Sequence, residues 1–103
     1  MPITPSGSPD EPNLREAFRA VARGDRDAFS FVYDELSTRT YSACSLHLSD
    51  PDERDAAMIR LWLHIWRLAD RISRSTRPVD EFIESLATRF AADIARRRLA
   101  TAV

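Results

Sequence analysis

The stretch from Asp50 to Ile72, DPDERDAAMIRLWLHIWRLADRI, constrains the fold more than any other part of the chain. Asp50 suits the N-cap of a helix, Pro51 suits its first turn, and acidic residues follow where the helix dipole favours them. At 3.6 residues per turn the stretch is apolar over most of its circumference. It predicts a helix with neighbours on more than one side, whose core face is Met58, Trp62, Ile65, Ala69 and Ile72.

The surface beside this core face has two interpretations. Ile59, Leu63 and Trp66 widen the apolar face to one side. Beyond them lies a basic ridge, formed by Arg60, His64, Arg67 and Arg71. In the first interpretation the helix is buried and its arginine side chains simply reach solvent. In the second, Ile59 and Leu63 beside the ridge form part of a docking surface.

The rest of the chain predicts further helices and no strand. Residues 1–12 are rich in Pro, Ser, Gly and acids, which predicts a disordered tail. After a candidate N-cap at Asn13, one helical pattern runs to Gly24 and a second runs from Asp25 to about residue 48. The polar segment SRSTR, residues 73–77, is closed by Pro78, so the last helix begins at Pro78 or just after it. We expect an all-α domain over residues 13–103, a compact bundle of four helices.

The composition limits the class of protein. A chain of 103 residues with 44% hydrophobic residues fits one domain with a core that needs no disulfide or metal. The net charge of −1 gives no overall signal for nucleic acid. All 15 basic residues are arginine, which binds phosphate and carboxylate in a bidentate way, although a GC-rich genome explains this bias equally well. The single Cys44, with no secretion signal and no membrane-length apolar run, predicts a cytoplasmic protein that does not enter a membrane.

No catalytic or metal-binding pattern is visible in the sequence. His47 and His64 are the only histidines, and neither has another His or Cys at ligand spacing. Cys44 has no basic partner and is interpreted as a buried structural thiol. There is no phosphate-binding glycine loop, since the chain has only two glycines. We therefore expect no cofactor and no enzyme activity, and the competing functions are all binding functions.

Three segments taken in order resemble region 2 of the sigma-70 family of transcription factors, in particular the extracytoplasmic-function group. They are GDRDAFSFVYDEL, then LSDPDERD leading to LWLHIWRLADRI, then FIESLATRFAADIARRR. The first matches a GDxxAF-type opening before a tyrosine, the second a GDP-type turn before a helix ending like FLRVWR, and the third a last helix ending in LRRR. The resemblance covers roughly residues 14–98, and no single motif in it is specific.

The resemblance implies a fold like sigma-70 region 2 and two binding partners. In the family, the central helix docks on the clamp helices of the RNA polymerase β′ subunit. The loop before the last helix, with that helix, captures unstacked bases of the promoter −10 element, which fits the use of arginine to neutralise phosphate. The positions implied for DNA binding are Arg71, Arg74, Arg77, Arg89, Arg96 and Arg97. The alternative for each is a solvated arginine or a cation that suits a helix C-terminus.

The sequence departs from the family on the docking face of the central helix. Where the family has an acidic-Gln-Glu pattern, this chain has Asp55, Ala56, Ile59 and Arg60, and a reversed charge selects against the usual partner. The positions implied for partner binding are Asp55, Ile59, Arg60, Leu63 and Arg67. No C-terminal region 4 follows Val103, so either an excised domain or a single-domain relative is expected.

Three functions follow from these observations. The first is promoter −10 recognition together with binding of the RNA polymerase core. The second is a degenerate stand-alone sigma-like protein, which regulates transcription by binding another protein, such as an anti-sigma factor, through the surface of Ile59, Arg60 and Leu63. The third is a helical interaction module with no role in nucleic-acid binding.

Overall fold

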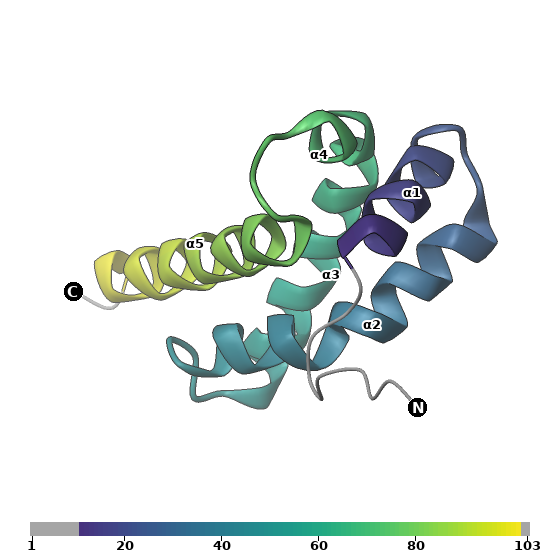
Figure 1. Ribbon diagram of the computed structural model, residues 1–103. Coiled ribbons are helices and arrows are strands. Elements are labelled where there is room, and N and C mark those ends of the chain that lie inside the picture. The colour runs from purple at the N-terminus through teal and green to yellow at the C-terminus, as the bar shows by residue number, and fades with distance from the viewer. Residues whose placement is uncertain (1–10, 102–103) are drawn as a thin grey trace, which may run out of the picture.

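Helices joined by short turns make up the part of the chain that the computed structural model describes, residues 11–101 (Figure 1). The all-α prediction is confirmed there, since no strand occurs between those residues. Residues 1–10 of the predicted tail lie outside the described part, and the first helix begins two residues before the candidate cap at Asn13. The helices are α1 (Glu11–Ala22), α2 (Arg26–Ser45), α3 (Pro51–Arg67), α4 (Ala69–Arg74) and α5 (Val79–Thr101).

The predicted number of four helices is wrong, because the central stretch divides at Leu68 into α3 and α4. Leu68 has φ −95° and ψ 7°, and its N–H is shared between the carbonyls of His64 at 2.9 Å and Ile65 at 3.1 Å. This tight turn redirects the chain so that Ala69, Ile72 and Ser73 are buried, with α4 packed against α1. Neither Gly nor Pro marks the break, so the sequence pattern runs through it unchanged.

The predicted helix starts and stops have the expected local chemistry. Gly24 follows α1 with φ +90°, a conformation that suits glycine. The Asp25 carboxylate accepts a hydrogen bond from the Ala28 N–H at 3.0 Å, and the Asp50 carboxylate accepts one from the Asp52 N–H at 3.0 Å. Pro78 precedes α5, and its carbonyl accepts the Phe82 N–H at 3.0 Å. These contacts fix where α2, α3 and α5 begin.

The predicted core face of the central stretch is confirmed. Met58, Trp62, Ile65, Ala69 and Ile72 are all buried. They meet large side chains from every other helix, among them Phe18, Leu36 and Ile83. Because α3 packs against both α2 and α5, it has the neighbours on several sides that its apolar circumference predicts (Figure 1). Within residues 11–101, no helix is both long and apolar enough to cross a bilayer.

Candidate functional site

The outward face of α3 carries an apolar strip, formed by Ile59 and Leu63. Their exposed fractions are 65% and 54%, so neither side chain contributes to the core. Asp55 lies one turn before Ile59 and Arg67 lies one turn after Leu63, and both are exposed. Residues at i and i+4 share a helix face, so these four side chains form a row that runs from acid through apolar to base. Four of the five positions implied for partner binding therefore lie together.

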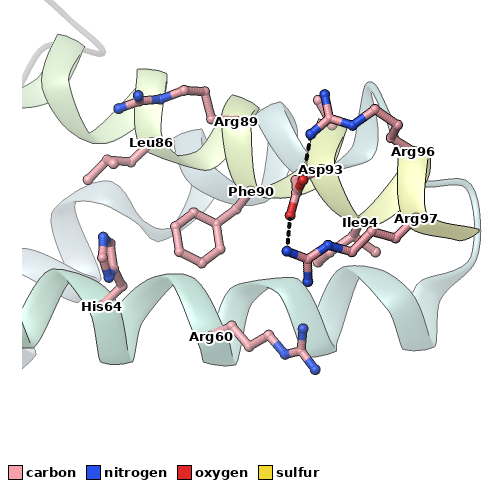
Figure 2. A pocket seen from close by; sticks show the side chains of 10 residues that line it. Arg60, His64, Leu86, Arg89, Phe90, Asp93, Ile94, Arg96 and Arg97 are labelled. Atoms are coloured by element: carbon pink, nitrogen blue, oxygen red, sulfur yellow. Dashed lines mark hydrogen bonds and ion pairs between the residues drawn. The ribbon is translucent and has the colours of Figure 1, made fainter.

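The fifth of those positions, Arg60, belongs to a different surface. It lines a hollow of about 600 Å³ between α3 and α5, which we call the α3–α5 groove. Figure 2 shows Phe90 and Arg97 reaching from α5 towards α3, where His64 and Arg60 lie. The groove thus brings Arg60 together with three of the positions implied for DNA binding. Its lining is Arg60, His64, Leu86, Arg89, Phe90, Ala92, Asp93, Ile94, Arg96 and Arg97.

The charge of the α3–α5 groove is strongly positive. Its lining holds four arginines and a single acid, Asp93. The Asp93 carboxylate accepts a hydrogen bond from Arg96 Nη2 at 2.5 Å through one oxygen, and its other oxygen lies 3.1 Å from Arg97 Nη2 (Figure 2). Arg60 and Arg89 are exposed, and neither makes an ion pair or side-chain hydrogen bond with another described residue. The groove therefore has more guanidinium groups than its own acid can neutralise.

The floor of the groove is partly aromatic. The His64 ring lies 5.2 Å from the Phe90 ring, measured between centroids, with 50° between the ring planes. Leu86 and Ile94 extend this floor along α5. Beside it, Arg98 Nη1 lies 2.9 Å from Glu53 Oε1 and joins the C-terminal end of α5 to the first turn of α3. This pair ties the two helices together beyond the groove.

The loop before α5 holds its arginines differently. Arg74 pairs with Asp70. Arg77 donates a hydrogen bond from Nη2 to the Ser85 hydroxyl at 3.0 Å, and its guanidinium lies 5.6 Å from the centre of the Phe82 ring. Arg71 is exposed and makes no such interaction with another described residue. Two of the three arginines implied for DNA binding here thus already have intramolecular partners.

One functional candidate was missed by sequence reasoning. Arg15, on α1, donates hydrogen bonds to the backbone carbonyls of Ser73 at 3.1 Å, Ser75 at 2.6 Å and Arg77 at 2.9 Å. Its side chain thereby fixes the path of the loop before α5. The only available signal was its place beside Leu14 on the face of α1 that turns inward, and that position does not reveal which segment it meets.

A second hollow connects the loop to the groove. It is lined by Arg77 and Arg89 together with Glu81, Glu84, Ser85 and Thr88. Since Arg89 lines both hollows, arginines follow α5 from the loop to the groove. Glu81 and Glu84 balance the two arginines of the second hollow, so the excess of positive charge is greater in the groove.

Residues 11–101, the described part of the chain, include both histidines and Cys44, the side chains considered for metal binding or thiol chemistry. No three His, Cys, Asp or Glu side chains gather there as a metal site would require. Burial raises the pKa of the Cys44 thiol above its ordinary value, so the group remains a neutral thiol near pH 7. His47 is exposed. What this surface offers is apolar area and guanidinium groups for binding.

Comparison with known proteins gives one informative relative. The chain is 35% identical over 65 residues to "ECF RNA polymerase sigma factor SigK" of Mycobacterium ulcerans (strain Agy99), where ECF denotes extracytoplasmic function. The match covers 63% of this chain and 34% of the relative, about a third of its length. No family model and no solved structure matches. The relative is named as a sigma factor and not as an enzyme, in agreement with the expected class.

Proposed function

We propose, on the premise that this chain contains an extracytoplasmic-function sigma factor-like domain, that it acts in transcription initiation as a region 2 domain. It docks on the clamp helices of the RNA polymerase β′ subunit and contacts single-stranded DNA of the promoter −10 element. The similarity to a sigma factor supports the transcription role, and the all-helical fold is compatible with it.

Polymerase docking rests on the apolar strip of Ile59 and Leu63. In the resemblance these residues occupy the docking face of the central helix, and both are exposed on α3. Exposed aliphatic side chains in a row bounded by charges are typical of an interface centre with a polar rim. The exposure of these two residues is the observation that carries the proposal, since a strip packed in the interior would leave no surface for the partner.

DNA contact rests on the arginines of the loop and of α5. Arg71 in α4 and Arg89 in α5 are exposed and make no ion pair with another described residue, so both are available to neutralise phosphate. Arg74, the last residue of α4, and Arg77, in the turn that follows, lie at the segment that the resemblance assigns to base capture. Arg15 holds that loop in one conformation, which lowers the entropy that binding would cost.

A pull-down with purified RNA polymerase core tests the docking proposal. The double variant Ile59→Asp, Leu63→Asp places two acids in the centre of the strip and is expected to abolish retention. Leu46→Asp is the matched control, because Leu46 is a leucine that is 82% exposed and caps the end of α2, outside the helix that carries the strip. Equal retention of the wild type and both variants would exclude docking through this face.

A second candidate function is favoured by the charge at Arg60. The resemblance has glutamate at this position, and arginine there opposes a partner surface adapted to an acid. The chain would then be a sigma-like regulator that acts by binding another protein, such as an anti-sigma factor, without ordinary polymerase docking. If the wild type fails to bind the core and the double variant Ile59→Gln, Arg60→Glu binds it, this second function is the correct one.

A further inference from the structure

The α3–α5 groove has features of a nucleotide site that neither the docking face nor the DNA-binding loop explains. Arg60, which the resemblance places on the docking face, lines this groove together with Arg89, Arg96 and Arg97. Relative to the glutamate of the family pattern, arginine at this position changes the local charge from −1 to +1. Arg60, the departure from the family pattern that opposes ordinary docking, therefore adds a fourth arginine to a groove that already holds three.

The clustering of four guanidinium groups in the groove favours an anionic ligand. Asp93 is shared between Arg96 and Arg97, which leaves Arg60 and Arg89 without an acidic partner among the described residues. Like charges that line one hollow repel each other, and a phosphate relieves that repulsion. Guanidinium groups bind phosphate oxygens in a bidentate way, so arginines from two helices that face one hollow suit a phosphate well.

The floor of the groove selects among anions. An acidic peptide would use the arginines but has no need of an aromatic surface. Here the rings of His64 and Phe90 lie 5.2 Å apart beside Leu86 and Ile94, within the same hollow as the arginines. Nucleic-acid bases stack on such side chains while nearby arginines hold their phosphates. The volume of about 600 Å³ lies within the usual size of a small-molecule site and leaves room for a base with its phosphate.

From this geometry we propose that the α3–α5 groove binds a nucleotide unit, with its base on Phe90 and His64 and its phosphate on Arg60, while Arg89, whose side chain points away from Arg60 in Figure 2, takes another phosphate of the same strand. Arg97, which pairs with Asp93, lies on the side of Arg60 and borders its phosphate position (Figure 2). The ligand chemistry has two possible sources, a single-stranded nucleic acid or a free nucleoside phosphate. Arg89 continues the track of arginines into the hollow beside Arg77, which favours the strand. The inference in that form rests on the proposed DNA binding and adds α3 to its surface.

Fluorescence anisotropy with a labelled single-stranded oligonucleotide of about 12 nucleotides tests the site on the whole chain. Arg60→Glu is expected to lower the affinity about tenfold and to make the slope of log K against log salt shallower by about 0.7. Phe90→Leu is expected to lower the affinity with the slope unchanged, since it removes stacking and no charge. Arg26→Glu, at the exposed start of α2, is the matched charge-reversal control and is expected to bind as the wild type does.

The outcomes separate this site from the proposed function. If Arg60→Glu binds normally while the double variant Arg74→Ala, Arg77→Ala is impaired, the groove is excluded and DNA binding through the loop stands.

A parallel titration uses AMP, ATP and inorganic phosphate. If the oligonucleotide fails to bind but AMP and ATP bind with the same dependence on Arg60, the site takes a free nucleotide and the DNA proposal is wrong. If no probe binds, both proposals are wrong. Thermal melts of each variant identify any loss of binding that comes from unfolding.

Discussion

The loop before α5 and the α3–α5 groove are both rich in arginine, but they use it differently. In the loop, Arg74 pairs with Asp70, and Arg77 contacts the Ser85 hydroxyl and the Phe82 ring. In the groove, Arg60 and Arg89 have no acidic partner among the described residues. Arg74 and Arg77 must give up existing contacts before they can bind a ligand, whereas Arg60 and Arg89 need not break an ion pair with another described residue.

This difference shows that arginine density in a sequence does not measure the positive field of a surface. The segment SRSTR has two arginines in five residues, yet Arg74 pairs with Asp70 and Arg77 contacts Ser85. The groove draws its arginines from α3 and from α5, more than twenty residues apart in the chain, and no local segment reveals it. The following four predictions test this contrast, from the largest expected effect to the smallest.

Leu86→Asp should have the largest effect, because Leu86 is 5% exposed and supports the groove from the core. An unpaired carboxylate buried there should cost about 4 kcal/mol or more, a large part of the stability of such a domain. Urea unfolding measures the change, with Thr88→Asp on the exposed side of the same helix as control. Wild-type stability of Leu86→Asp would mean that α5 faces another way, and the groove would lose its basis.

Arg15→Ala should affect the loop and leave the groove intact. It removes three hydrogen bonds from a charged donor to the carbonyls of Ser73, Ser75 and Arg77, and should cost about 2 kcal/mol. Amide hydrogen exchange should become faster at residues 73–77 and stay unchanged at Arg89 and Phe90. Arg19→Ala is the control, since Arg19 on the same helix forms an exposed ion pair with Glu16 and makes no hydrogen bond to the loop among the described residues. Unchanged exchange in the loop would remove the role assigned to Arg15.

The sequence determines the helices and their faces far better than it determines their neighbours. Helical periodicity and capping residues place α2, α5 and the start of α3 within a few residues. The same periodicity separates the buried Met58 and Trp62 from the exposed Ile59 and Leu63. The break at Leu68 could not be predicted, because it depends on how α4 packs against α1 and has no local marker. The position of Arg60 in the groove and the contact of Arg15 with the loop could not be predicted for the same reason. Both depend on which helices meet, and periodicity in one segment contains no information about that.

Alanine pairs compare the two regions directly in oligonucleotide binding. Arg60→Ala with Arg89→Ala should lower the affinity at least tenfold, because both side chains are available to phosphate. Arg74→Ala with Arg77→Ala should lower it only a few-fold, because each residue gives up an intramolecular contact when it binds DNA. Both pairs should flatten the salt dependence. A larger loss for the loop pair would mean that the loop arginines, and not Arg60 and Arg89, are the main phosphate contacts.

Glu53→Gln should have the smallest effect. It removes the exposed ion pair with Arg98 that joins α3 to the end of α5, and such pairs contribute about 0–1 kcal/mol. The urea midpoint should move slightly and oligonucleotide binding should stay within twofold of the wild type. A large loss of binding would mean that this pair sets the width of the groove.

The most direct test of the account is an NMR titration of the labelled protein with a single-stranded oligonucleotide, following every backbone amide. We expect the largest shift changes at Arg60, His64, Arg89 and Phe90, smaller ones at residues 74–77, and none at the α1–α2 turn around Gly24. Shift changes confined to that turn, or none at a saturating oligonucleotide concentration, would contradict the claim that α3 and α5 together form a nucleic-acid surface.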